Sequence, residues 1–293
     1  MLVKLNFKNC TNYCYFVKVW GLIQKLDVVL KQIFEVLNYK VKPKKHLGQH
    51  FLNDTSIAER VALLFKDETG LLPVIEIGPG MGVLTDFLLQ NFPEVKAVEI
   101  DSESVVYLKQ SHVPKGLHLL EGDFLNDNIA MSALTTDSYI VGNFPYNISS
   151  QIVFKVLEHV ELVKGFGGMF QKEVAQRLVA PPGSKTYGIL SVLLNTFYTS
   201  TYEFTVEPHV FTPPPKVKSG VIKCVRKEGF ELPCSKKLYY DVIKTAFNQR
   251  RKTLRNALHK FNLKETDEFA KLRAEQLSVN DFITLTQFFE KNP

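Results

Sequence analysis

Short apolar runs alternate with amphipathic segments along most of the chain. Residues 95–98 and 138–142 have the length and composition of buried strands, whereas residues 83–89 carry apolar side chains at helical spacing. Strands that alternate with helices predict the α/β class, with a Rossmann-like parallel sheet. Ligands of such sheets bind beyond the carboxyl ends of the strands, so the residues that follow each strand are the first candidates for function.

The second half of the chain extends this pattern and ends in a helical region. Strands are expected at residues 165–170, 199–206 and 219–225, and helices at 148–160, 187–197, 239–247, 252–258, 270–277 and 279–289. The proline-rich segment 212–215 predicts a rigid loop between the last two strands. We therefore expect an N-terminal extension (1–40), a Rossmann-like domain (41–228) and a small all-helical domain (229–293).

Three glycines, Gly78, Gly80 and Gly82, lie between the apolar run at 71–75 and the helix at 83–89. Glycines let the backbone approach a ligand closely, and the N-terminus of the following helix favours a negative group. A dinucleotide fingerprint needs its third glycine at the position of Val83, so a nicotinamide cofactor is disfavoured. The alternative is a tight turn that binds nothing.

Two acids follow the next predicted strands. Glu99 closes the run at 95–98, at the distance where an acid accepts hydrogen bonds from ribose hydroxyls. Asp123 follows the run at 117–121, where a carboxylate can bind an adenine amine. Either residue alone would be read as a solvated charge at the end of a strand.

The tetrapeptide Asn143-Phe144-Pro145-Tyr146 follows the strand at 138–142. Its residue types suit methyl transfer to an adenine amine, whose lone pair is delocalised into the ring. The carboxamide oxygen of Asn143 and a backbone carbonyl near Pro145 can each accept one N–H and so localise that lone pair. Tyr146 can stack on a base that has swung out of its helix. Alone, the tetrapeptide would be read as an ordinary turn.

Together these motifs resemble the S-adenosylmethionine-dependent ribosomal RNA adenine N6-dimethyltransferases, a family that modifies two adjacent adenosines near the 3′ end of small-subunit RNA. The resemblance extends from about residue 41 to the C-terminus and includes motifs at 44–54, 98–101, 122–123, 142–149, 171–175, 183–185, 214–217 and 247–252. It implies S-adenosylmethionine as cofactor, small-subunit ribosomal RNA in a pre-ribosomal particle as partner, and a cytoplasmic location. We expect a monomer without a metal ion.

Position by position, the resemblance implies a cofactor site made of His50, Leu52, Gly78, Gly80, Glu99, Asp123 and Asn143. It implies a catalytic set made of Asn143, Phe144, Pro145 and Tyr146. Two residues depart from the family pattern, because His50 stands where many members have Asn and Phe144 replaces the more usual Leu. An imidazole can still donate or accept a hydrogen bond, and Phe144 is expected to keep an apolar wall while altering the pocket width.

Composition agrees with a globular enzyme. With 293 residues and 45% hydrophobic content, the chain can bury one substantial α/β core and one smaller domain. No apolar run is long enough to cross a membrane. The cysteines, Cys10, Cys14, Cys224 and Cys234, lack the spacing with histidine that is typical of a zinc site, so we expect free thiols in a reducing compartment.

The net charge of +6 is distributed unevenly. Residues 1–45 hold nine basic and two acidic side chains, and residues 236–264 hold nine and one, whereas residues 46–235 hold fifteen and twenty-one. Basic flanks on an acidic body predict phosphate contacts in the flanks. The candidate RNA-binding residues are Lys185, Arg250, Arg251, Lys252 and Arg255. The alternative is a solvated charged face.

Residues 1–40 lie outside the resemblance. They are either a real extension, such as a targeting or RNA-binding arm, or the product of a start codon assigned too far upstream. Scattered aromatic residues and the lack of a clean amphipathic presequence favour the second interpretation.

Two other functions compete with methylation of small-subunit RNA. A non-catalytic ribosome-assembly or nucleic-acid-binding factor would not need the complete set of glycine loop, acids and tetrapeptide. A large-subunit adenine methyltransferase of the macrolide-resistance type is closer, but the basic region at 247–258 and the loop around Lys185 resemble the small-subunit branch better.

Overall fold

The computed structural model describes residues 19, 21–24, 26–27, 41–68, 72–264 and 266–292. The chain divides into two units, Met1–Lys42 and Pro43–Pro293. In the first unit, the described residues between 19 and 27 are helical. The predictions for the remainder of residues 1–40, including Cys10 and Cys14, lie outside the described residues.

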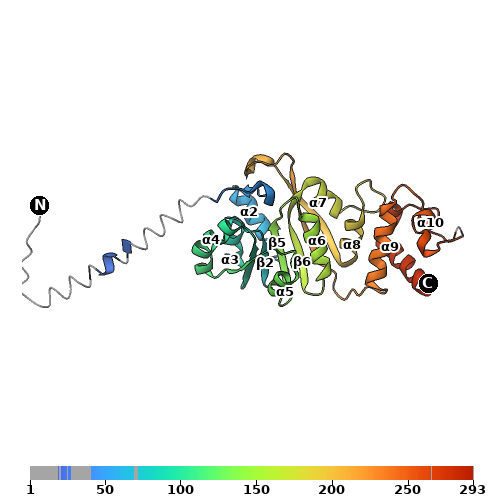
Figure 1. Ribbon diagram of the computed structural model, residues 1–293, viewed down its shortest axis with the longest axis horizontal. Coiled ribbons are helices and arrows are strands. Elements are labelled where there is room, and N and C mark those ends of the chain that lie inside the picture. Colours follow the sequence, from blue (N-terminus) through green and yellow to red (C-terminus); the bar gives the residue numbers. More distant parts are fainter. Residues whose placement is uncertain are drawn as a thin grey trace, which may run out of the picture. The chain divides into compact units, whose positions relative to one another are not determined.

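A seven-stranded sheet forms the centre of the second unit (Figure 1). Its strand order is β4-β3-β2-β5-β6-β9-β7, in which β4 to β6 are parallel and β9 is antiparallel to both of its neighbours. The strands are β2 (Val74–Ile77), β3 (Val95–Glu99), β4 (His118–Glu121), β5 (Ser138–Asn143), β6 (Val163–Gln171), β7 (Tyr198–Val206) and β9 (Ser219–Arg226). The prediction of a Rossmann-like α/β fold is confirmed.

Helices cover both faces of the sheet because successive residues of the buried strands point to opposite sides. On one face Val74 packs in a cluster with Phe65 and Leu88, and on the other Ile75 packs in a cluster with Ile152. The helices of this part are α2 (Thr55–Ala62), α3 (Val83–Asn91), α4 (Ser102–Ser111), α5 (Asp127–Ala133), α6 (Ser149–Glu158), α7 (Lys172–Leu178) and α8 (Ile189–Phe197). Within the described ranges, no helix has the length and apolar character needed to cross a bilayer.

A short two-stranded sheet lies apart from the main one. It pairs β1 (Phe51–Leu52) with β8 (Phe211–Thr212) in antiparallel register. The neighbouring Asn53 strengthens this pairing, because its backbone N–H donates to the Val210 carbonyl at 2.8 Å. Residues 44–53, which include the 3₁₀ helix η1 (Lys45–Leu47), are called the arm below. The proline-rich segment that follows β8 is a loop, as expected.

The C-terminal residues form helices α9 (Lys236–Asn248), α10 (Leu254–Ala257) and α11 (Val279–Lys291), drawn in orange and red in Figure 1. They share one apolar cluster with α8 and the sheet, in which Tyr239 and Phe282 are fully buried. The Tyr239 hydroxyl also lies 2.8 Å from the hydroxyl of Thr196 in α8. The domain boundary at residue 228 stays a prediction.

The predicted helix at 270–277 is wrong. Only the 3₁₀ turn η5 (Ala274–Gln276) forms there. The backbone carbonyls of Ala270 and Leu272 instead accept the N–H groups of Arg255 and Leu254, at 3.1 and 2.7 Å. These carbonyls satisfy donors at the start of α10 that have no partner inside that helix, so the local helical pattern gives way to a tertiary contact.

The two cysteines in the described ranges are free thiols. Cys224 is buried in the apolar core, and burial raises the pKa of its thiol to about 12. Cys234 is partly exposed, and burial raises the pKa of its thiol to about 11. Both therefore stay protonated and unreactive near neutral pH.

Candidate active site

A cavity of about 310 Å³ lies at the carboxyl ends of β2, β3, β4 and β5. The arm, the glycine loop, the strand ends and the tetrapeptide all contribute to its walls. All seven residues predicted to contact the cofactor line it: His50, Leu52, Gly78, Gly80, Glu99, Asp123 and Asn143. Its volume is in the range of small-molecule sites.

The glycine loop adopts the conformation that its composition predicts. Gly78, Gly80 and Gly82 have φ values of 68°, 58° and 79°, in the left-handed region that other residues rarely occupy. A Cβ on Gly80 would lie 2.9 Å from the Phe51 ring of the arm, and one on Gly82 would lie 2.4 Å from the His112 ring. Close packing therefore reinforces the requirement for glycine at both positions.

Glu99 joins the glycine loop to the start of α4. The side chain is buried, and its two carboxylate oxygens accept the backbone N–H groups of Gly80 and Asp101, at 2.9 and 2.8 Å. Burial raises the pKa of Glu99 although both hydrogen bonds oppose that shift. The carboxylate is thus fixed in position at the cavity wall, as recognition of ribose hydroxyls requires.

Glu76 is a second buried acid at this edge of the sheet. Its protonation state is not evident from the sequence. Its carboxyl oxygen accepts a hydrogen bond from the Thr85 hydroxyl at 2.6 Å. Burial raises the pKa of Glu76 to about 8, because the low-polarity surroundings disfavour the charged form. Glu76 therefore carries its proton at neutral pH.

Because of this raised pKa, we expect Glu76→Gln to become more stable than the wild-type protein as the pH rises. Above about pH 4.5 the unfolded chain loses this proton while the folded protein keeps it up to about pH 8, so stability falls as the pH rises through this window. The full cost is on the order of 5 kcal/mol. We expect denaturant unfolding to show Glu76→Gln close to wild type at pH 5 and clearly more stable at pH 9. A difference in unfolding free energy between the two proteins that does not change with pH would contradict the raised pKa of Glu76.

Apolar residues that the sequence analysis did not identify complete the cavity wall. Ile100 and Phe124 directly follow the two predicted acids, Glu99 and Asp123, and both line the cavity. Ile100 is 52% exposed, which is unusual for a large aliphatic side chain and suits a surface that a flat ring covers. The signal available in the sequence was an apolar residue immediately after each strand-end acid.

The arm orients the carboxamide of Asn143. The Asn143 Nδ2 group donates to the backbone carbonyl of His50 at 2.8 Å. Because a carbonyl can only accept, this bond fixes which end of the amide is NH₂. The Asn143 Oδ1 atom is thereby left as the acceptor, which is the role that the sequence analysis assigns to it.

The rest of the tetrapeptide is anchored in the core. Phe144 is 1% exposed and packs against Phe166 and Phe170, with ring centroids 5.2 and 4.9 Å away. Although Phe144 lines the cavity, its main contacts therefore lie behind the site. The Pro145 carbonyl accepts the Ile148 N–H at 3.2 Å, which fixes the turn that follows.

The rings of Tyr146 and His50 line the cavity together with Asn143. The Tyr146 hydroxyl lies 2.5 Å from the Ser219 hydroxyl, and burial raises the Tyr146 pKa, so the phenol stays neutral. The Tyr146 ring lies 5.5 Å from the His50 ring. The His50 Nδ1 atom lies 2.7 Å from the Pro213 carbonyl and must carry a proton to donate to it, which leaves Nε2 for a ligand.

The predicted RNA-binding residues lie outside this cavity. Arg250 donates to the Glu275 carboxylate at 2.6 Å and to the Lys185 backbone carbonyl at 2.7 Å, so it fastens the Lys185 loop to the C-terminal helices. The side chains of Lys185, Arg251 and Lys252 are exposed. Arg255 is also exposed and follows the first residue of α10.

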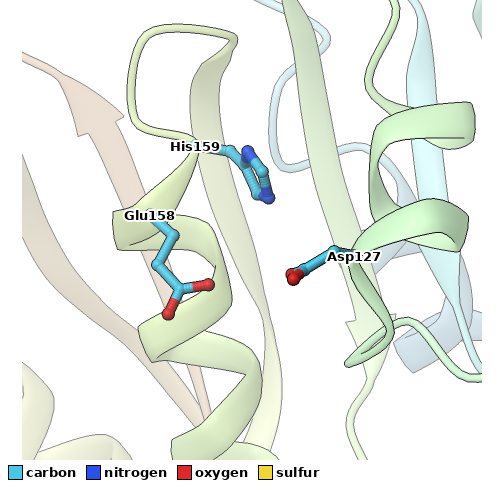
Figure 2. A group of neighbouring side chains, drawn as sticks. All are labelled: Asp127, Glu158 and His159. Carbon is cyan, nitrogen blue, oxygen red and sulfur yellow. The ribbon is translucent and has the colours of Figure 1, made fainter.

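Asp127, Glu158 and His159 converge elsewhere, between α5 and the end of α6, as Figure 2 shows. The Nζ atom of Lys155 lies 2.5 Å from the Asp127 carboxylate and 2.8 Å from that of Glu158. This ammonium group offsets one of the two negative charges, and we assign no ion to the cluster.

Comparison with known proteins places these features in context. The family model described as "Ribosomal RNA adenine dimethylase" matches residues 40–291. The chain is 54% identical to a ribosomal RNA small subunit methyltransferase A of Flavobacterium johnsoniae, over 86% of this chain and 97% of that protein.

Two solved structures share the fold. A dimethyladenosine transferase from Plasmodium falciparum matches with a TM-score of 0.69 and 27% identity, over 83% of this chain and 98% of that one. A 23S rRNA methyltransferase matches with a TM-score of 0.59 and 20% identity, over 81% and 99% of the two chains.

Proposed function

The chain belongs to the ribosomal RNA adenine dimethylase family, and on this basis we propose that it methylates the N6 amines of two adjacent adenosines near the 3′ end of small-subunit ribosomal RNA. The observation that carries the proposal is the single cavity that unites Glu99 and Asp123 with Asn143. Glu99 and Asp123 suit the ribose and adenine of a nucleoside, and Asn143 suits the amine of a substrate adenine.

The residues present fit S-adenosylmethionine, which supplies an electrophilic methyl group when bound. Glu99 would hold the ribose hydroxyls, and Asp123 would accept from the adenine amine. The apolar side chains of Ile100 and Phe124 would cover the faces of the adenine ring. The glycine loop would let the backbone approach the remainder of the cofactor.

The substrate amine needs acceptors more than it needs a strong base. The Asn143 Oδ1 atom and the Phe144 carbonyl would each accept one N–H, which localises the nitrogen lone pair toward the methyl group. Pro145 fixes the backbone that presents this carbonyl. Tyr146, held by Ser219, would stack on the flipped base. The surplus proton can leave after transfer, when the nitrogen has become cationic.

The C-terminal region would contact RNA phosphates through Arg251 and Lys252, which lie between α9 and α10, and through Arg255 of α10. Lys185 would contact RNA near the active site. Arg250 would act indirectly, because its side chain already binds Glu275 and the Lys185 carbonyl. We propose that the enzyme works in the cytoplasm as a monomer on a pre-ribosomal particle.

The test is methyl incorporation from labelled S-adenosylmethionine into small-subunit particles that lack the modification, with large-subunit RNA in parallel. Mass spectrometry should detect N6-dimethyladenosine in small-subunit RNA alone. Signal in large-subunit RNA alone would assign the macrolide-resistance type of activity. Tight RNA binding by folded protein without incorporation would favour a non-catalytic assembly factor.

A further inference from the structure

The arm forms one wall of the cavity, and contacts at both of its ends attach it to the body. Its far end is fixed by the β1–β8 pairing, and its Asn147 contact, from Nδ2 to the His46 carbonyl, is long at 3.4 Å. The near end is held by a different kind of contact, an ion pair. Lys44, which precedes η1, pairs with Asp101, which caps the N-terminus of α4. The Lys44 Nζ atom also lies 3.3 Å from the Glu103 carboxylate.

Asp101 is the centre of a closed set of polar contacts. Asp101 is buried, and its side chain binds the Lys44 ammonium through one carboxylate oxygen. The other oxygen accepts from Gln49 Nε2 at 3.3 Å and from the Ser104 hydroxyl at 3.0 Å. Gln49 Oε1 in turn accepts the Lys44 backbone N–H at 2.8 Å. Burial opposes the charge on Asp101, but the bonds from Lys44, Gln49 and Ser104 outweigh it and lower the Asp101 pKa.

This set is joined to both halves of the proposed active site. The Asp101 N–H donates to Glu99, and the other oxygen of Glu99 accepts from Gly80 in the glycine loop. On the opposite side, Gln49 directly precedes His50, whose carbonyl orients the Asn143 amide at 2.8 Å. A shift of the arm would therefore move the group that holds Asn143 in place.

We propose that Lys44 and Asp101 are positioning residues that form a latch, which couples the cofactor wall at Glu99 to the orientation of Asn143. This inference rests on the proposed function. Neither Lys44 nor Asp101 lines the cavity, so both act through the residues they hold. Loss of the ion pair detaches the near end of the arm from α4, which loosens both the cofactor wall at Glu99 and the orientation of Asn143.

The variant Lys44→Met removes the cation and keeps a long side chain. We expect cofactor release from the protein, followed with S-adenosylhomocysteine by surface plasmon resonance, to become about 5- to 10-fold faster. We also expect kcat at saturating cofactor to fall by about 10-fold, because saturation restores occupancy but not the orientation of Asn143. In the free protein, amide hydrogen exchange at residues 46–52 should accelerate.

The matched control is Lys45→Met, which removes the same charge from the next position. Lys45 is exposed and forms no ion pair among the described residues, so cofactor release and arm exchange should match wild type. Lys44→Arg should restore wild-type behaviour. Lys44→Met combined with Asp101→Asn should cost less than the sum of the two single changes. If Lys44→Met folds poorly, Lys44→Gln is the second variant.

The latch is overturned if Lys44→Met and Lys45→Met release cofactor and exchange arm amides at equal rates. A purely structural ion pair would lower the melting temperature of Lys44→Met without changing kcat at saturating cofactor, and this result would also overturn it. Failure of the proposed function is distinguishable, because the wild-type protein would then leave small-subunit RNA unmethylated. Cofactor release and hydrogen exchange are measured without RNA and report on the latch in either case.

Discussion

Replacing Asn143 with alanine should reduce methyl transfer by at least about 10²-fold. The side chain supplies one of the two proposed acceptors for the adenine amine, and removal of one preorganised hydrogen-bonding group from an active site commonly costs about 10²–10³ in rate. Its Oδ1 atom is free for this task because Nδ2 is bound to the His50 carbonyl. Single-turnover methylation with saturating cofactor measures this effect.

Asn147→Ala is the control for this substitution. Asn147 lies four residues away, and its Nδ2 atom also donates to a carbonyl of the arm, that of His46, at 3.4 Å. Loss of an arm contact alone should therefore affect both variants, whereas loss of the acceptor affects only Asn143→Ala. Cofactor affinity of Asn143→Ala should fall far less than turnover. Undiminished turnover would remove Asn143 from the mechanism.

Replacing Gly168 with alanine should destabilise the protein by at least about 3 kcal/mol. Gly168 lies in the buried strand β6 with φ of 145°, beside Gly142 of β5. A Cβ at this position would lie 2.1 Å from the Gly142 carbonyl oxygen and 2.9 Å from the Phe144 ring. The backbone oxygen cannot move without breaking the pairing of β6 with β5, the strand that leads into the tetrapeptide. Denaturant unfolding measures the loss, with poor solubility as the extreme outcome.

The control variant, Gly116→Ala, separates the cost of backbone strain from the cost of a steric clash. Gly116 also has a positive φ, 104°, but a Cβ there would meet no atom within 4 Å. Gly116→Ala should therefore cost only the backbone strain, about 1–2 kcal/mol. If Gly168→Ala is no less stable than Gly116→Ala, then the contact with Gly142 does not constrain the sheet.

The sheet could be predicted from the sequence because its buried strands and glycine loop follow local rules. Residues at strand ends must meet at one edge of a parallel sheet, and the predicted cofactor residues therefore share one cavity. The helix at 270–277 was mispredicted because helical spacing does not reveal that the Ala270 and Leu272 carbonyls are used by α10.

Other features of the site depend on contacts between distant residues. The bond from Asn143 to the His50 carbonyl joins residues 93 positions apart, and no local pattern encodes it. The proton on Glu76 depends on how completely the fold excludes water from one carboxyl group. The tight contact between Gly142 and Gly168 depends on strand register, which a glycine in an apolar run does not specify.

The apolar cluster shared by the sheet, α8 and the C-terminal helices limits where segments of related proteins can be joined in a chimera. A recombination joint near residue 228 would separate Thr196 from Tyr239 and pair the surface of one parent with the helices of another. A joint placed before α8 would transfer both partners together. Chimeras built to exchange RNA specificity should therefore inherit α8 and the C-terminal helices from the same parent.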